Sequence, residues 1–96
     1  MIYIKSKNII ISNGKDNQFD LRDSNTFEII ETFKSEFEEL RSGLDNLDRG
    51  TCYLGFTKGI VEFNSESRKI IRALKTNSIV YQIQAIKDDY LLLGEW

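Results

Sequence analysis

Polar and apolar residues alternate near both ends of the chain and in its centre, which is the pattern of half-buried β-strands. Strands are therefore expected at residues 1–12, 51–57, 60–63, 79–86 and 90–96. The first is either one long strand or a hairpin that turns at residues 6–8. Turn residues at Lys58-Gly59 and Asp88-Asp89 fold the later strands into hairpins.

Two other segments carry apolar residues three or four positions apart, the spacing of one helix face. A first helix is expected from an N-cap at Asn25 to a terminating Gly43. Its apolar stripe consists of Ile29, Ile30, Phe33, Phe37, Leu40 and Leu44. A second helix is expected to start at Asn64 or Ser65 and to end at residues 76–78; its buried side consists of Ile70, Ile71 and Leu74.

The expected order of elements is hairpin, helix, hairpin, helix, hairpin. Because short connections between strands produce antiparallel pairs, the expected fold is α+β, with one antiparallel sheet of about five or six strands and both helices packed on it. A chain of 96 residues supports one core, so residues 1–96 are expected to form a single domain. The hairpins beside the helices form a loose echo, but their residues do not match one by one, and no internal repeat is inferred.

Composition removes most familiar catalytic machinery. The chain has no histidine and one cysteine, so catalytic triads, imidazole bases and zinc sites are excluded. Cys52 is either a reactive thiol or, as we expect without a histidine to activate it, a small buried strand residue. Catalysis by carboxylates, Lys or Tyr stays open, as does a carboxylate site for Mg²⁺ or Ca²⁺.

The acidic residues nevertheless offer few such sites. Residues 16–20 lack the central glycine and the closing glutamate of a calcium loop. The pairs Asp45/Asp48 and Asp88/Asp89 stand where turns favour Asp. We therefore expect no enzymatic activity, no cofactor and no metal.

The sequence pattern also predicts a location. Apolar runs fall well short of the roughly 18 residues of a membrane helix. The N-terminus lacks the regions of a signal peptide. A single cysteine fits a reducing compartment, so the cytoplasm is the expected location.

Charged residues supply the main functional clue in a chain of net charge −2. The polar side of the first expected helix is acidic, which suits either a solvated face or docking on a basic partner. With two residues beyond the helix, this set is Glu28, Glu31, Glu38, Glu39, Asp45 and Asp48. The outer side of the second expected helix is basic, which suits helix stability or phosphate binding. That set is Arg68, Lys69, Arg72 and Lys75.

Aromatic residues in the predicted hairpins could stack on single-stranded nucleic acid, although core packing explains them more simply. Trp96 either packs onto the core or anchors a partner.

The profile of a small acidic domain without catalytic equipment is shared by inhibitors, by immunity proteins and antitoxins, and by phage antidefence proteins. The first hypothesis is a binding protein that inhibits or neutralises a basic partner, such as a nuclease or a nucleic-acid-binding effector, through the acidic set. The alternative is a nucleic-acid or nucleotide binder that uses the basic set. An enzyme that uses carboxylates alone and a homodimer are further hypotheses.

Overall fold

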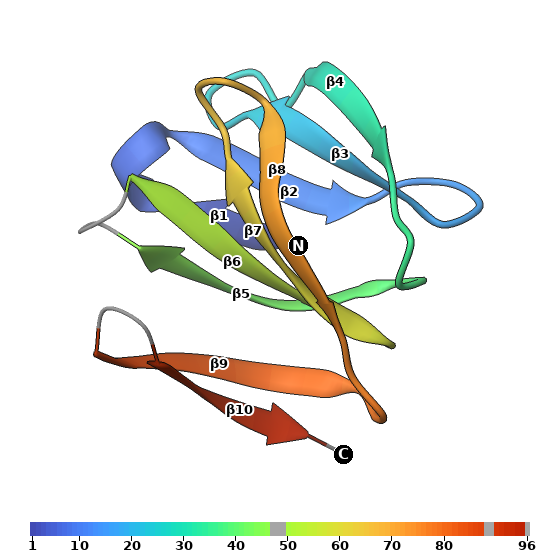
Figure 1. Cartoon of the computed structure of the whole chain (residues 1–96). Coiled ribbons are helices and arrows are strands. Elements are labelled where there is room, and N and C mark those ends of the chain that lie inside the picture. The colour runs from blue at the N-terminus through green and yellow to red at the C-terminus, as the bar shows by residue number, and fades with distance from the viewer. Residues whose placement is uncertain (47–49, 88–89, 96) are drawn as a thin grey trace.

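The computed structural model describes residues 1–46, 50–87 and 90–95, and this part of the chain forms ten β-strands and one short 3-10 helix (Figure 1). The strands form three antiparallel sheets, each in chain order. The first sheet contains β1 (Ile2–Ile4), β2 (Ile9–Asn13), β3 (Gln18–Asp23) and β4 (Ile29–Lys34), with the 3-10 helix η1 (Lys5–Lys7) after β1. The second contains β5 (Leu40–Asn46), β6 (Thr51–Phe56), β7 (Gly59–Asn64) and β8 (Lys69–Lys75). The third contains β9 (Val80–Lys87) and β10 (Tyr90–Glu95).

The α+β prediction with two helices is wrong. The segment predicted as the first helix forms β4 and the start of β5, and the segment predicted as the second forms the β7–β8 turn and β8. The hairpin alternative for residues 1–12 is confirmed, because Ile2 pairs with Ile11 across η1. The predicted hairpins at residues 51–63 and 79–95 are also confirmed.

A β-bulge explains why β4 has a helical spacing of apolar residues. Leu21 pairs with Glu31 but the next residue, Arg22, pairs with Ile29, so Ile30 is an extra residue in β4. The bulge shifts the alternation by one position, and the apolar residues at 29, 30 and 33 then have the spacing of a helix face. The same bulge in β8 produces the apolar residues at 70, 71 and 74.

The first two sheets repeat each other at a separation of 41 residues through their third and fourth strands. Glu62 pairs with Arg72 and Phe63 with Ile70. Each of these residues stands 41 positions after its counterpart in the bulge of the first sheet. The turns before the two strands also match. Asp23 accepts from the N–H groups two and three residues later, and so does Asn64.

The third sheet, β9 and β10, repeats the pairing of β5 and β6, which form the inner half of the second sheet. Leu40 pairs with Phe56 and Ser42 with Gly55, with a bulge between them. In the third sheet Val80 pairs with Glu95 and Gln82 with Gly94, and a bulge again lies between the two pairs. The loose echo seen in the sequence, from which no repeat was inferred, thus corresponds to a repeat of strand pairing. The repeat lies in strand register and is hidden in the sequence because most equivalent residues differ.

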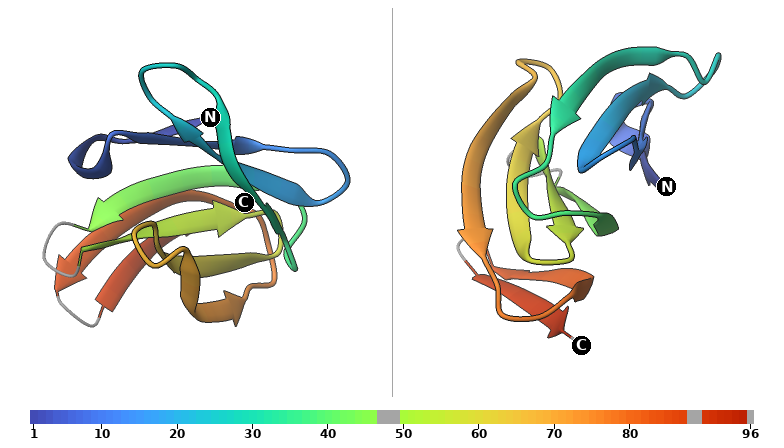
Figure 2. Two further views of the ribbon diagram at one scale, coloured as in Figure 1. Left: turned by 90° about the horizontal axis from the view of Figure 1, so that it is seen from above. Right: turned by 90° about the vertical axis from the view of Figure 1, so that its right-hand side faces the viewer.

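The sheets stack face to face with the second sheet in the middle (Figure 2). The larger core lies between the first and second sheets and includes Phe19, Leu21, Phe56 and Phe63. A smaller core lies between the second and third sheets; it contains Tyr53, Ile60, Val80 and Ile83, with Leu44 beside it. Every residue of β6 is therefore buried.

Glycine permits close approach between the second and third sheets. A Cβ atom on Gly55 would lie 2.8 Å from Cγ1 of Val80, so a side chain there would push β9 away.

Among the described residues, no helix is both long enough and apolar enough to cross a membrane.

Candidate functional site

The acidic set does not form one face. Glu28 precedes β4, and Glu31 lies on β4 with its carboxylate 3.2 Å from the Arg68 guanidinium. Glu38 and Glu39 lie instead in the β4–β5 connection. The helix face predicted from Glu28, Glu31, Glu38 and Glu39 is thus wrong, because the segment is extended and its side chains point in different directions.

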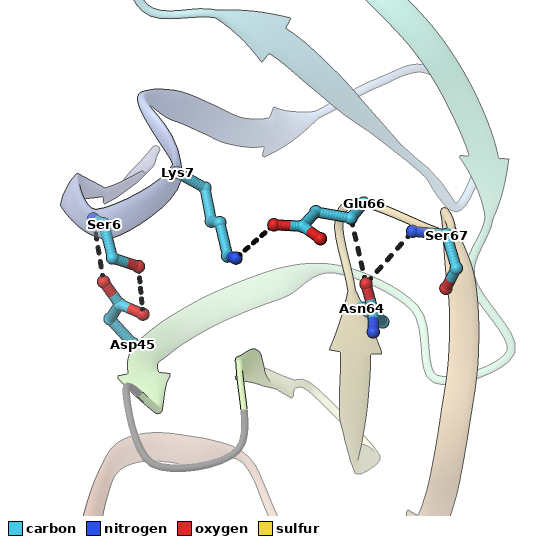
Figure 3. A network of polar contacts seen from close by, with 6 residues as sticks. All are labelled: Ser6, Lys7, Asp45, Asn64, Glu66 and Ser67. Atoms are coloured by element: carbon cyan, nitrogen blue, oxygen red, sulfur yellow. Dashed lines mark hydrogen bonds and ion pairs between the residues drawn. The ribbon is translucent and has the colours of Figure 1, made fainter.

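Asp45, from the same acidic set, holds the first two sheets together (Figure 3). It lies on β5 and accepts hydrogen bonds from the Ser6 backbone N–H at 3.0 Å and from the Ser6 hydroxyl at 2.8 Å. Next to it, the ammonium group of Lys7 pairs with Glu66 in the β7–β8 turn. These contacts give Asp45 a structural role. Asp48 lies outside the described residues.

Glu38 and Glu39 line an open depression of about 440 Å³ beside the β2–β3 loop. Its other lining residues include Asp16 and Asn17. Glu38 pairs with Lys58 at 2.7 Å. The carboxylate of Glu39 lies 3.4 Å from a guanidinium nitrogen of Arg41. Asp20, which belongs to the segment weighed as a calcium loop, is buried on β3 and accepts from Thr32 instead. Among the described residues no three potential ligand side chains form a metal cluster.

The basic set lies on one strand and the turn before it, so its helical arrangement is also wrong. Arg68 occupies the turn with a left-handed backbone conformation (φ 58°) and pairs with Glu31. Arg72 lies on β8 and donates to Glu62 from Nε at 2.8 Å. Lys69 and Lys75, at the two ends of β8, are exposed, and no ion pair joins either to a described residue.

Glu62 is a buried carboxylate that the sequence interpretation missed. Its side chain is 2% exposed and accepts from Arg72 and from the Thr51 hydroxyl at 2.7 Å. Hydrogen bonding to Glu62, followed by its negative charge, raises the pKa of Arg72 above its ordinary value. The signal was present in the alternation of β7, where Glu62 stands between Val61 and Phe63. A charged residue between two apolar residues of a buried strand needs a partner.

All seven residues of β8 are exposed, which is true of no other strand from β1 to β7 whose burial pattern is described. It is the outermost strand of the second sheet, so one side of its backbone has no neighbouring strand. Large apolar side chains are exposed along it: Ile70 by 45%, Ile71 by 50% and Leu74 by 63%. An exposed edge with apolar residues is a common place for another strand to bind.

The remaining candidate for chemistry, Cys52, is a core residue. It is 1% exposed, and burial raises the pKa of its thiol to about 12, with smaller contributions from Asp45 and Glu62. The prediction that it is a small buried strand residue is confirmed. The sequence matches no known protein family, and no curated protein matches it.

Proposed function

We propose that the protein binds another protein by adding an extended segment of that partner to the free edge of β8. The observation that carries the proposal is the complete exposure of this strand together with three large apolar side chains. An added strand would satisfy the free backbone groups of the edge, and its side chains would cover the isoleucines and Leu74. Main-chain hydrogen bonds would supply affinity, and the side chains would supply selectivity.

The partner segment is expected to alternate apolar and acidic residues. Lys69 and Lys75 mark the two ends of the strand, and both ammonium groups are free to pair with carboxylates. A second copy of β8 fits poorly, because antiparallel pairing about Arg72 would place Lys69 against Lys75 and the two arginines against each other. Nucleic-acid binding has weaker support, because Arg68 and Arg72 already pair with carboxylates of the chain.

The test is the binding of a labelled seven-residue peptide in which Glu alternates with Ile, followed by fluorescence polarisation at two salt concentrations. The double variant Lys69→Glu/Lys75→Glu should weaken binding by about tenfold, since two ion pairs of about 0.7 kcal/mol each are replaced by repulsion. The matched control is Lys5→Glu/Lys15→Glu, which makes the same change in charge at exposed sites away from β8. Equal weakening by both double variants would show non-specific attraction and would sink the proposal.

A second candidate function follows from the acidic depression at Asp16, Glu38 and Glu39. Its carboxylates could receive basic side chains of a partner, which retains the hypothesis of an inhibitor of a basic protein at a smaller site. Calorimetric titration with a lysine-rich peptide tests it. Asp16→Asn/Glu39→Gln should weaken binding, and Glu28→Gln/Glu66→Gln, with the same change in charge elsewhere, should not.

A further inference from the structure

In the described part of the chain, the third sheet has two strands where each of the first two sheets has four. In the first sheet β2 is followed by β3 and β4, and in the second sheet β6 is followed by β7 and β8. β10 repeats β6 in register but has only β9 as a neighbour among the described strands. No described strand lies beside the other edge of β10, at the position that β7 occupies next to β6.

The face of the second sheet that points to the third sheet is covered over only part of its width. β9 packs over β5 and β6, the inner half of that face. Ile60 and Leu74 pair across β7 and β8 on the outer half of the same face. Leu74 is 63% exposed there.

The equivalent position in the first sheet shows what a complete neighbour does. Phe33 stands 41 residues before Leu74 on the matching strand. Its ring stacks on Phe19 at 5.2 Å and meets the edge of Phe63 at 5.0 Å. Phe63 lies on β7, so the third strand of the second sheet covers Phe33 of the first sheet. The third sheet has no such strand in the described part of the chain, and Leu74 is uncovered for that reason.

We propose that the free edge of β10 and the surface around Leu74 receive a β-hairpin, which completes the third sheet as its third and fourth strands. The hairpin resembles residues 59–75 in chemistry: its first strand alternates apolar and polar residues and carries a large, preferably aromatic, residue opposite Leu74. The ladder along β10 fixes its register, and the apolar contact with Leu74 fixes which face points inward.

The outer face of the first sheet combines polar and apolar residues, because Tyr3, Ile10 and Ile29 lie in one row with Arg22 there. The outer face of the first sheet carries Asp20 and Arg22, where the second sheet has Val61 and Phe63 at the matching positions. Arg22 donates to the hydroxyl of Ser12 at 3.1 Å, and its guanidinium lies 4.6 Å from the ring centre of Phe27. Consecutive four-stranded sheets stacked in this way also follow one another in β-propellers.

The test uses the full chain with a flexible Gly/Ser linker and a second copy of residues 59–75 joined after Trp96. Tethering raises the effective concentration of the hairpin to the millimolar range. The readout is hydrogen–deuterium exchange of the backbone amides of β10. Their exchange should slow by about tenfold or more relative to a tethered scrambled copy of the same residues.

Leu74→Glu tests whether the hairpin occupies the proposed surface. In the tethered protein it should abolish the protection of β10, while in the untethered chain it should leave exchange of β10 unchanged. Ile29→Glu is the matched control, because Ile29 is 51% exposed and pairs with Arg22 on the outer face of the first sheet. Unchanged exchange of β10 with the tethered hairpin, or protection that survives Leu74→Glu, would overturn the proposal. So would a dimer of the untethered chain that Leu74→Glu dissociates, because the occupant would then be a second copy.

Discussion

The first and second sheets follow the same path but have different surroundings, and this difference explains their different chemistry. Both are four-stranded antiparallel meanders with the same bulge and the same turn before the last strand. The first sheet is covered on one face, so its other face can hold the polar contacts of Arg22 and Asp20. The second sheet is covered on both faces, so its charged residue Glu62 must be paired in the interior.

The comparison teaches that backbone register can persist while side-chain character changes. Asp20 and Arg22 correspond to Val61 and Phe63, and Leu21 corresponds to Glu62. In each case the residue suits what covers that face in its own sheet, since burial favours apolar or paired groups. The position in the stack, and not the position in the strand, determines which residue fits.

The largest expected contrast is in thiol reactivity. Cys52, paired with Phe63, corresponds to Ile10, paired with Arg22 on the outer face of the first sheet. At about pH 8 a thiol with a pKa of about 12 is thiolate roughly a thousandfold less often than an ordinary cysteine. Ile10→Cys in a Cys52→Ala background should therefore react with a disulfide reagent far faster than native Cys52. Equal rates would contradict the difference in burial, and an unfolded sample of each protein is the control.

The next contrast is in core packing. Phe63 is fully buried and contacts the rings of Phe19 and Phe33. Phe63→Ala should lower the free energy of unfolding by about 3–5 kcal/mol. Arg22→Ala, at the matching position on the open face, should lower it by about 1 kcal/mol. Urea denaturation measures both, with Phe63→Leu as a milder variant if Phe63→Ala does not fold. Equal losses would mean that the two faces are equally covered.

The ion pair between Glu62 and Arg72 gives a smaller effect and a distinctive rescue. Arg72→Met removes a cation that pairs with Glu62 and should lower the free energy of unfolding by less than Phe63→Ala does, because the Arg72 side chain is 56% exposed. Glu62→Leu/Arg72→Met should restore most of that stability, since Leu21 shows that this register position accepts leucine. A double variant as unstable as Arg72→Met would contradict this account.

The smallest contrast is in the two matching turns. Hydrogen bonds from the backbone N–H groups of Thr26 and then Asn25 lower the pKa of Asp23 below its ordinary value of 3.8. A carboxyl group with a lowered folded-state pKa contributes stability above its unfolded pKa and loses it as the pH falls through the folded pKa. Asp23→Asn should therefore make the unfolding free energy less sensitive to acid below about pH 4. Asn64→Asp should add the same sensitivity to the second turn. Parallel pH profiles for wild type and both variants would contradict it.

The sequence predicted the regularly alternating strands of the central hairpin and misassigned β4 and β8, in which a bulge displaces the apolar pattern. Residues 51–63 alternate regularly and form the predicted hairpin. In β4 and β8 one extra residue displaces the pattern, and local periodicity cannot separate a bulged strand from a helix. The caps were misleading for a related reason. Asn64 accepts two backbone N–H groups as a helix N-cap would, but the chain after it turns back into a strand.

The candidate site residues also divide into those that local sequence predicted well and those that depend on tertiary packing. The basic residues are near one another in sequence and remain together on β8 and the turn before it, whereas the acidic residues were grouped by a helix that does not form. Glu62 was overlooked because its partners Thr51 and Arg72 lie on neighbouring strands and only strand pairing brings them beside it. Leu74 was assigned to the core, and only comparison with Phe33 shows why it is exposed.

By itself the sequence determined the turn at Lys58-Gly59, the regular strands beside it and the core role of Cys52, because these depend on local pattern and residue type. Only the tertiary structure decided which strands are bulged, which sheet faces are covered and which edge is free. Those properties depend on what packs against each strand, and the packing partners come from segments far apart in the chain. The repeat of 41 residues belongs to this second group, since it is a repeat of backbone pairing between residues whose side chains have diverged with their surroundings.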